Sequence, residues 1–477
     1  MSNENVLGAV KWSFAGELCA RAVQPIVFVV MAKLLTPADF GIAAAGVMAI
    51  SFSQIFWEGG LAKAIIQRQS QVEAAASTAF WMNAILGSAV AVILFIAAPF
   101  IADHIFHDAK VAAVLRVMVF HILLGSLASI PTALIQKNMQ FDRIFWIRVV
   151  TVVVPGLLSV PLALAGWSYW ALVAGTLTGQ LAQTVAVWWV GKWRPALSFE
   201  PPLAAEIFRF GRWSVLSGLL NWFYIWADSL VVGFFLGSRD FGIYRTGSQF
   251  VAMIYSLMFA PILPVLYSHF SGFSSEHERV SRVLTKVMQV LTFVSLPVGF
   301  VIFTFSSVLE QVFFGAQWQG VALVIGVMGL VQGYAWIVSA DGEAYRAIGK
   351  PSYETIVSGF SVGLYLLGYL VSIHFGIESF MWTRLGLALV AIGFHLALNR
   401  YVLKVDVISL LKSKAILTVA GILLYTGYTF VVTAPDIWMR VVVPIVCAVG
   451  MVWIAFLPRM KAGALQVWGL ARKGIGV

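Results

Sequence analysis

Two stretches of this chain repeat one another and decide its architecture. Residues 12–42 read WSFAGELCARAVQPIVFVVMAKLLTPADFGI, and residues 213–243 read WSVLSGLLNWFYIWADSLVVGFFLGSRDFGI. Aligned without gaps, they are identical at 9 of 31 positions. Most identities fall in apolar sequence, where chance matches are common. The run Asp-Phe-Gly-Ile at 39–42 and 240–243 is harder to obtain by chance, so the offset of 201 residues indicates an internal duplication.

The composition is that of a membrane protein. Of the 477 residues, 60% are hydrophobic and only 11% are charged, whereas a soluble chain carries about 25% charged residues. Too few polar residues remain to cover a soluble surface, which excludes a soluble enzyme, a disordered chain and a fibrous protein. Despite the net charge of +10, nucleic acid is not a predicted partner, because the basic residues stand in short gaps between apolar runs.

Neither a metal nor a cofactor is predicted. Cys19 and Cys447 lie in separate apolar runs without a CxxC neighbour, so a zinc site or a disulfide framework is not expected. The segment from Gly342 to Lys350 is not a phosphate-binding loop, because its glycines are seven apart and Pro351 replaces the Ser or Thr that would bind magnesium. Without an ATP site, transport would draw on an ion gradient, the membrane potential or the substrate's own gradient.

We predict an all-α polytopic membrane protein with about 14 transmembrane helices, counted as apolar runs of about 20 residues. The predicted spans are Ser13–Leu34, Phe40–Ala62, Ser77–Ala102, Val111–Ile135, Ile144–Ala165, Trp167–Val190, Trp213–Leu236, Tyr244–Tyr267, Val283–Val308, Val321–Ala340, Thr355–Phe375, Phe380–Asn399, Ala415–Thr433 and Ile437–Leu457.

The distribution of Lys and Arg predicts the orientation. If the N-terminus is cytoplasmic, 23 of the 31 basic residues fall on the cytoplasmic side and 7 on the outer side, while Arg21 lies within the first span. This asymmetry favours an even number of spans with both termini in the cytoplasm.

Six spans separate the two copies of the repeat, so both copies enter the membrane from the same side. Parallel repeats of this kind place substrate between two halves that rock against each other. We therefore expect two six-helix lobes around a central cleft, followed by two further helices. The predicted divisions are residues 1–191 for the N-terminal lobe, 192–212 for a cytoplasmic linker, 213–400 for the C-terminal lobe and 401–477 for the last two spans and a cytoplasmic tail.

Charged residues within spans are the first functional candidates, because each is costly in hydrocarbon. Glu17 and Arg21 lie one helical turn apart in the first span, and Pro25 follows them. A kink at Pro25 beside a charged pair is typical of a mobile helix that lines a cavity. The alternative is an ion pair that only neutralises itself against neighbouring helices.

Span seven carries the second candidate. Asn221, Tyr224 and Asp228 share one helix face, and Asn221 with Trp222 aligns with Ala20 and Arg21 in the first copy. The alternative for Asp228 is a hydrogen-bonded structural carboxylate.

Span eight is the repeat partner of span two, and both should line the cleft. Arg245 is the charged candidate there, although it also lies near the outer end of its span, where an arginine can reach headgroups. Gln54, Glu58 and Gln249 are further candidates on these two spans.

Several loop and span-end segments, in this order and spacing, resemble a known family. They are Lys33–Gly41, Gly60–Arg68, Ala133–Phe141, Trp170–Val173, Trp193–Pro195, Phe210–Trp213 and Ala347–Pro351. Through about span 11 the chain resembles the Wzx-type polysaccharide exporters, which are similar to colanic-acid exporters and belong to the multidrug/oligosaccharidyl-lipid/polysaccharide flippase superfamily.

The resemblance implies a flippase rather than an enzyme. Its members move undecaprenyl-diphosphate-linked oligosaccharide repeat units from the cytoplasmic to the periplasmic leaflet of the bacterial inner membrane, for exopolysaccharide, O-antigen or capsule synthesis. Their cavities tend to be cationic, which makes Arg21 and Arg245 the candidates for the diphosphate. Glu17 and Asp228 become candidates for ion coupling or gating. Membrane lipids and a polysaccharide polymerase or export machinery are the expected partners.

Three alternatives stay open. A lipid II flippase and an ion-coupled multidrug antiporter share the superfamily. A membrane-bound glycan polymerase or ligase would need long outer loops with catalytic residues, and only the short loop with His104, His107 and Asp108 offers any.

Overall fold

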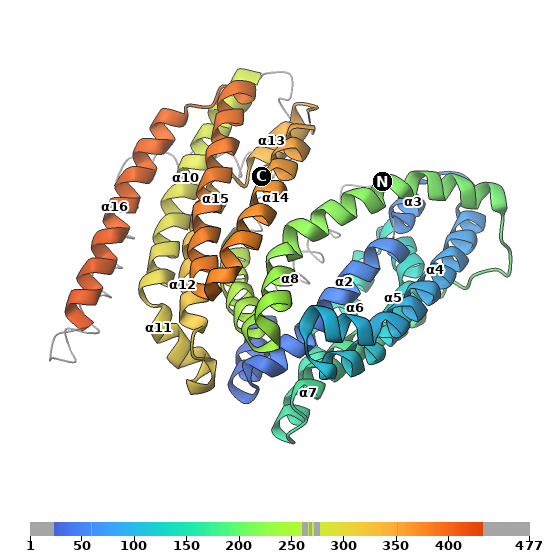
Figure 1. Ribbon diagram of the computed structural model, residues 1–477. Coiled ribbons are helices and arrows are strands. Elements are labelled where there is room, and N and C mark those ends of the chain that lie inside the picture. Colours follow the sequence, from blue (N-terminus) through green and yellow to red (C-terminus); the bar gives the residue numbers. More distant parts are fainter. Residues whose placement is uncertain are drawn as a thin grey trace. The chain divides into compact units, whose positions relative to one another are not determined.

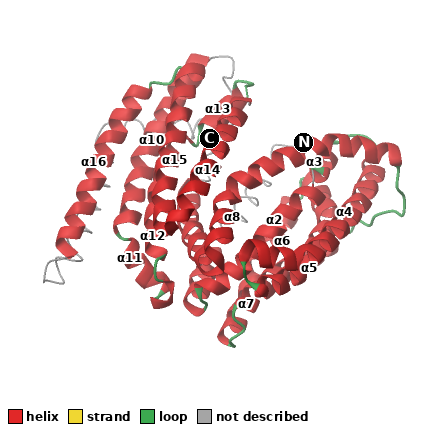
Figure 2. Cartoon of the chain, viewed as in Figure 1, coloured by secondary structure: helices red, strands yellow, loops and turns green. Residues whose placement is uncertain are grey.

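The computed structural model describes residues 23–58, 60–259, 277–350 and 352–432, together with Leu266 and Phe270. Within these residues the regular secondary structure is entirely helical (Figure 2), which confirms the predicted all-α fold class. Helices suit a chain in lipid because each satisfies its own backbone hydrogen bonds. The helices of eight residues or more are 23–34, α2 (Pro37–Glu58), α4 (Val72–Ile101), α5 (Ala109–Lys137), α6 (Phe141–Leu164), α7 (Tyr169–Gly191), α8 (Pro201–Phe259), α10 (His277–Thr304), α12 (Val321–Ala335), α14 (Ser352–Ser372), α15 (Gly376–Leu403) and α16 (Val407–Val432).

Shorter helices connect these elements. They are α3 (Leu61–Gln67), α11 (Ser306–Leu309), α13 (Asp341–Ala347), the π-helical turns η1 (Ala102–Phe106) and η2 (Glu310–Phe314), and the 3₁₀ turns η3 (Ala316–Trp318), η4 (Trp336–Val338) and η5 (Ile373–Phe375).

Nine stretches of the described chain are long and apolar enough to cross a membrane. Two of them, Ser214–Phe259 and Ser352–Leu403, have 46 and 52 residues, and a single crossing takes about 20. Each contains a glycine with a positive φ, Gly237 at 79° and Gly376 at 89°, so each is long enough for two crossings. The pattern is consistent with the predicted count of about 14, although the predicted span at 437–457 lies outside the described residues.

The chain forms two compact units, Met1–Arg245 and Thr246–Val477 (Figure 1). In the first unit α4 packs against α5, α6 packs against α7, and α5 also packs against α2 and α7. In the second unit α10 packs against α12 and α16, and α15 packs against α12 and α14. The predicted lobe boundaries stay a prediction.

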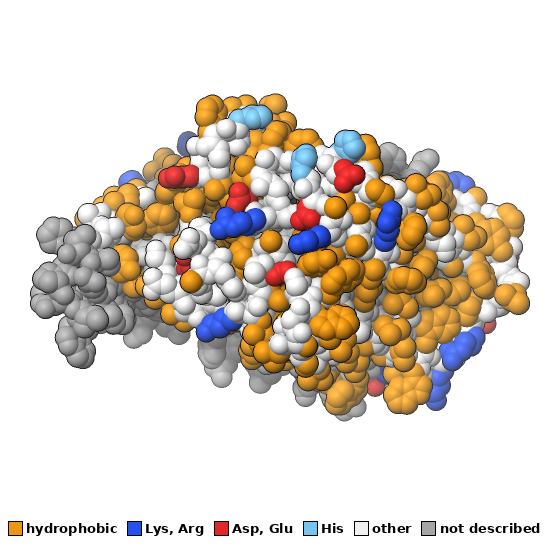
Figure 3. Space-filling model, turned by 60° about the horizontal axis from the view of Figure 1, so that its bottom comes forward, with side chains coloured by type: hydrophobic (Ala, Val, Ile, Leu, Met, Phe, Trp, Pro, Cys, Tyr) orange, Lys and Arg blue, Asp and Glu red, His pale blue; other side chains and the backbone are white. Residues whose placement is uncertain are grey.

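Hydrophobic side chains cover much of the surface, with charged side chains scattered among them (Figure 3). Along α4, Ile85, Val92 and Ile96 are each more than half exposed. An apolar outer surface is what a helix needs to face lipid tails.

Residues 238–243, predicted as a loop, are helical instead. Helix α8 runs from Pro201 to Phe259 and departs from helical geometry only at Gly237 (φ 79°, ψ −177°). Gly237 tolerates this conformation because it has no Cβ, and the helix resumes at the next residue. The chain can therefore reverse direction at one glycine without a longer loop.

The two copies of the repeat meet in the first unit at their shared glycines. A Cβ atom on Gly41 would lie 1.8 Å from the carbonyl oxygen of Ser238, and a Cβ on Gly242 would lie 1.8 Å from that of Pro37. Gly41 and Gly242 are 201 residues apart, and so are Pro37 and Ser238, so the contact has the symmetry of the repeat. The repeated Asp-Phe-Gly-Ile run thus has a physical reason, since only glycine allows the two backbones to approach this closely.

The first aspartate of the repeated run joins two helix starts. The Asp39 carboxylate is buried. It accepts hydrogen bonds from the backbone N–H of Thr36 (3.0 Å) and the Thr36 hydroxyl (2.6 Å) at the start of α2. It also accepts from the N–H of Tyr169 (3.1 Å) and the hydroxyl of Ser168 at the start of α7. One side chain therefore satisfies donors at the beginnings of both helices.

Asp39→Ala is expected to lower the free energy of unfolding by about 2–3 kcal/mol, because two helix starts lose a cap worth about 1 kcal/mol each and buried donors stay unpaired. Thermal unfolding of the purified protein in detergent measures the loss. Asp240→Ala is the matched control, because the Asp240 side chain is partly exposed and lies 3.6 Å from Arg239 in a surface ion pair, which contributes less than about 1 kcal/mol. Equal losses in the two variants would contradict the assignment.

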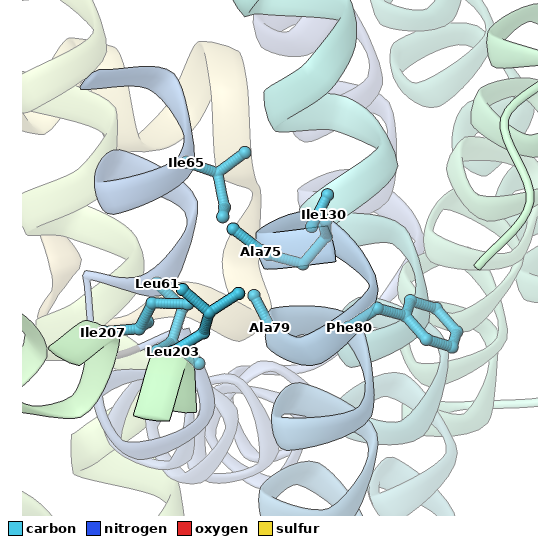
Figure 4. Close-up of a cluster of buried hydrophobic side chains, with 9 residues drawn as sticks. Leu61, Ile65, Ala75, Ala79, Phe80, Ile130, Leu203 and Ile207 are labelled. Atoms are coloured by element: carbon cyan, nitrogen blue, oxygen red, sulfur yellow. The ribbon is translucent and has the colours of Figure 1, made fainter. Parts of the chain in front are cut away.

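The first residues of α8 pack against other helices of the first unit. Leu203 and Ile207 join a buried cluster with side chains of α3, α4 and α5, among them Leu61, Ile65 and Ile130 (Figure 4). Polar contacts support the same docking. The Trp81 indole N–H donates to the Ala196 carbonyl (2.9 Å), Ala196 N–H donates to Ser77 Oγ (3.1 Å), and Arg68 pairs with Glu206 (3.1 Å). Residues 196–207 of the predicted linker are therefore packed within the first unit.

Candidate functional site

The charged pair predicted in the first span, Glu17 and Arg21, lies outside the described residues. Its roles in a cavity stay predictions.

Gly237 divides α8 into two arms, with Asp228 on the arm before it and Arg245 on the arm after it. Each of these two side chains contacts a side chain on the other arm. The buried Asp228 carboxylate accepts a hydrogen bond from the Tyr244 hydroxyl (2.8 Å) and from the N–H of Ser229 (2.5 Å). The Arg245 guanidinium lies over the Trp226 ring, 3.8 Å from its centroid. Both predicted side chains therefore take part in holding the two arms of α8 together.

The other polar candidates are more accessible. Asn221, although it shares a helix face with Asp228, is exposed, and so is Gln249 in the second unit. Gln54 is also exposed at the surface of α2, and its amide donates to Glu58 Oε2 (2.6 Å). Of these residues, Gln54 and Glu58 line a pocket within the first unit.

This pocket has a volume of about 170 Å³ and lies among α2, α3, α5 and α7. We call it the glutamine pocket, because four glutamines from three helices line it. Its lining residues are Gln54, Trp57, Glu58, Ala62, His121, Gly125, Ala128, Ser129, Thr132, Ala133, Gln136, Gln180 and Gln183.

Helical spacing explains how these side chains converge. On α5 the lining residues His121, Gly125, Ser129, Thr132 and Gln136 are separated by three or four positions. Residues with this spacing lie on one face of a helix. The same holds for the Gln180–Gln183 pair on α7 and the Gln54–Glu58 pair on α2. One polar face from each of three packed helices therefore forms the pocket.

A glycine makes room for the largest side chain at the pocket. A Cβ atom on Gly125 would lie 3.0 Å from Cη2 and 3.1 Å from Cζ2 of Trp57, and 3.7 Å from Nε2 of Gln180. The Trp57 ring is therefore held flush against the backbone of α5, with only 4% of the residue exposed. A rigidly packed indole next to an amide is suited to orienting a small ligand.

Three buried polar atoms of the lining have no hydrogen-bond partner among the described residues. They are the indole Nε1 of Trp57, Nδ1 of His121 and Oγ of Ser129. Buried polar groups are normally hydrogen-bonded, and each one left unpaired costs free energy. Three of the residues that line the pocket therefore each carry a buried polar atom without such a partner among the described residues.

The pocket has the chemistry of hydrogen bonding rather than of ion binding. In the described part of its lining there is neither lysine nor arginine, and Glu58 and His121 are the titratable side chains. Glutamine amides donate and accept hydrogen bonds without carrying charge. No group of three or more His, Cys, Asp or Glu side chains suited to a metal occurs in the described part of the chain.

The second unit holds a separate buried polar network that joins α13 to α15. Oδ2 of Asp341 lies 2.7 Å from Nδ1 of His395 and accepts from Nδ2 of Asn399 (3.2 Å). The Tyr345 hydroxyl donates to Oδ1 of Asn399 (2.5 Å). Asp341 follows the 3₁₀ turn η4, where the span Val321–Ala347 changes its helical geometry. These bonds brace that irregular segment.

Sequence reasoning missed most of the pocket, because it weighed charges in the spans more than amides. His121, Gln136, Gln180 and Gln183 all lie in apolar helices. An amide in hydrocarbon also needs a partner, so the spacing of these residues was a usable signal. The convergence of three helices, however, is visible only in the structure.

The comparisons with known proteins agree with this fold. The model of a family described as polysaccharide biosynthesis proteins matches residues 30–323, well over half of the chain. The chain belongs to this family. The predicted resemblance to polysaccharide exporters is thereby confirmed.

The curated relatives of this polysaccharide biosynthesis protein have low sequence identity to it, but the similarity covers most of the chain. It is 23% identical to the succinoglycan biosynthesis transport protein ExoT of Rhizobium meliloti over 68% of this chain and 65% of the relative. It is 23% identical to the teichuronic acid biosynthesis protein TuaB of Bacillus subtilis over 73% of this chain and 72% of the relative. For the lipopolysaccharide biosynthesis protein WzxC of Escherichia coli the identity is 22%, over 69% and 67%. The chain thus spans about two thirds of the length of these relatives.

Solved structures show the same fold in transporters. The lipid II flippase MurJ in its inward closed conformation has a TM-score of 0.72 at 13% identity, covering 94% of this chain and 98% of MurJ. An inward-facing multidrug resistance MATE family transporter has a TM-score of 0.60 at 14% identity, covering 82% and 99%. At these identities the likeness establishes the fold alone, which is a multi-pass arrangement of membrane-spanning helices.

Proposed function

We propose that this protein is a flippase that moves a polyprenyl-diphosphate-linked oligosaccharide from the cytoplasmic to the periplasmic leaflet of the bacterial inner membrane. The glutamine pocket is the observation that carries the proposal, because it places hydrogen-bonding groups inside a bundle of membrane-length helices. Membership of the polysaccharide biosynthesis family and the relatives that act in succinoglycan, teichuronic acid and lipopolysaccharide synthesis support it.

The physical task is to shelter a polar head in hydrocarbon. A sugar hydroxyl moved out of water without a new partner loses several kcal/mol, and amides that donate and accept can replace the lost hydrogen bonds. The lipid tail can stay in the bilayer throughout. A cavity that opens alternately to the two leaflets then needs to enclose only the head group, and two lobes related by the internal repeat would provide this motion.

Arginines would bind the diphosphate, because a guanidinium forms paired hydrogen bonds to phosphate oxygens. Arg21 and Arg245 are the proposed pair. Glu17, Asp228, Asn221 and Gln249 are proposed to line the path of the head group or to couple its movement to an ion. The proposed lobes are residues 1–191 and 213–400, and the proposed orientation has both termini in the cytoplasm, as the positions of Lys and Arg predict.

Deletion of the gene tests the function. The deleted strain should lose surface polysaccharide and accumulate a lipid-linked oligosaccharide that membrane-impermeant glycan-modifying reagents cannot reach in spheroplasts, and the restored gene should make it accessible. Loss of viability with accumulation of lipid II would favour a lipid II flippase instead. Proton-dependent dye efflux with normal polysaccharide would favour a multidrug antiporter.

Arg21→Ala is expected to reduce polysaccharide export at least tenfold at normal membrane levels, because the diphosphate loses a charge-assisted contact. Arg21→Lys should keep part of the export, since the charge remains without the paired geometry. Polysaccharide per cell, normalised to membrane-inserted protein, gives the readout. Full export by Arg21→Ala would remove this residue from the proposed diphosphate site and leave the flippase proposal standing.

A further inference from the structure

We propose that the glutamine pocket is a subsite for a single uncharged pyranose ring of the lipid-linked glycan, separate from the site of the diphosphate. This inference rests on the proposed flippase function and adds the chemical class of the sugar that the first unit selects.

Charge separates the two sites. Among the residues that the structure describes, no lysine or arginine lines the pocket, and Glu58 contributes a carboxylate to it. An anionic group placed there would meet repulsion from Glu58 and no fixed cation from the described lining. A diphosphate or a uronic acid therefore does not suit the pocket, whereas a neutral sugar does.

The hydrogen-bonding groups suit vicinal hydroxyls. The amides of Gln136, Gln180 and Gln183 offer both donors and acceptors, and the Trp57 indole N–H is a buried donor without a partner among the described residues. A sugar hydroxyl can accept from one amide N–H and at the same time donate to another amide oxygen. A ring with several hydroxyls can satisfy groups from three helices at once, which an apolar drug cannot do.

The size of the pocket limits the ligand to about one ring. Its volume of about 170 Å³ exceeds by far the ~10–15 Å³ that a single water needs. It is smaller than the ~300–1,000 Å³ of pockets for drug-sized ligands. One sugar of the repeat unit would occupy it, and the others would lie outside.

The packing around Trp57 keeps the pocket in shape without a ligand. The ring contacts the backbone position of Gly125, and the Gln180 amide lies next to the same position. Because donor and amide are held by packing, binding would cost little ordering of these side chains. This geometry favours selection between sugars over loose adaptation to many ligands.

Binding of three lipid probes tests the subsite. The probes are undecaprenyl diphosphate, undecaprenyl-diphosphate-glucose and undecaprenyl-diphosphate-glucuronic acid, each titrated into purified full-length protein in detergent and followed by native mass spectrometry. The glucose probe should bind at least about tenfold more tightly than the bare diphosphate, as two or more added hydrogen bonds would give. The glucuronic acid probe should show no such gain.

Variants assign the gain to the pocket. Gln180→Leu combined with Gln183→Leu should abolish the preference for the glucose probe and leave the affinity for bare undecaprenyl diphosphate unchanged. Glu58→Gln should raise the affinity for the glucuronic acid probe by roughly five- to tenfold, because a nearby like charge is removed. Gln289→Leu is the control, since this glutamine lies in the second unit and donates to Ser409 (3.1 Å); it should bind all three probes like the wild type.

The outcomes separate the two proposals. If the Gln180→Leu/Gln183→Leu variant keeps the full preference for the glucose probe, the subsite is overturned and the flippase proposal stands. If the wild type binds the glucuronic acid probe as well as the glucose probe, selection for an uncharged sugar is overturned. If the wild type binds none of the three probes, the proposed flippase function fails along with the subsite.

Discussion

Gly41→Ala should abolish polysaccharide export and lower the free energy of unfolding by about 3 kcal/mol or more. The added methyl would lie 1.8 Å from the carbonyl oxygen of Ser238, and backbone atoms cannot move aside as a flexible side chain can. Overpacking of ordinary cores costs about 1–3 kcal/mol, and here two helices must separate. Export per membrane-inserted protein and thermal unfolding in detergent measure the two effects.

Because the contact is symmetric, the equivalent substitution at Gly242 gives a second test. Gly242→Ala should have an effect of the same size, because its methyl would meet the carbonyl oxygen of Pro37 at the same 1.8 Å. The double variant should lose less free energy of unfolding than the two single variants added together, because either substitution alone already breaks the shared contact. Gly386→Ala is the control, because a Cβ on Gly386 would meet open space. Additive losses, or a tolerated Gly41→Ala, would contradict the close approach.

His395→Ala should lower the free energy of unfolding by about 3 kcal/mol, because the buried Asp341 carboxylate loses a hydrogen-bond partner. The imidazole lies 2.7 Å from Oδ2 of Asp341, a residue only 5% exposed. Without it, that carboxylate keeps only the Asn399 amide at 3.2 Å as a described side-chain partner. Differential scanning calorimetry of the detergent-solubilised protein measures the loss of stability.

A second substitution shows whether charge is the cause. Asp341→Asn in the His395→Ala background removes the carboxylate and should recover at least half of the lost stability. His395→Gln should lose less than His395→Ala, because an amide can still donate to Asp341. If the double variant regains stability, the Asp341 carboxylate is the cause of the loss, and its hydrogen bonds stabilise the segment around η4. Equal stability of the wild type and His395→Ala would contradict this role.

The fold class was predictable because lipid leaves a chain few choices. Apolar runs of about 20 residues imply helices that satisfy their own backbone, and the structure bears this out over the described residues. Boundaries were less predictable. The sequence around Gly237 suggested a loop as far as Ile243, but the helix resumes at Ser238, since one glycine with a positive φ is enough to break the helix.

The candidate site, like the helix boundaries, could be predicted from the sequence only in part. Charges such as Asp228 and Arg245 stand out in apolar sequence, yet the structure places both in contacts between the arms of α8. Glutamines attract less attention one at a time, and Gln54 alone was selected from the four of the pocket. Their common location depends on how α2, α5 and α7 pack, which is a property of long-range contacts and not of local pattern.

By itself, the sequence of this protein determined that the chain is a helical membrane protein with a repeat offset of 201 residues, because hydropathy and period are local properties that solvation in lipid enforces. Only the tertiary structure decided what the repeated Asp-Phe-Gly-Ile run does. It brings Gly41 against Gly242 and makes Asp39 the cap of two helices, whereas Asp240 at the matching position pairs with its neighbour Arg239. It also decided that three helices turn their amides toward one pocket, because the partners of a buried polar group are chosen by packing between distant segments.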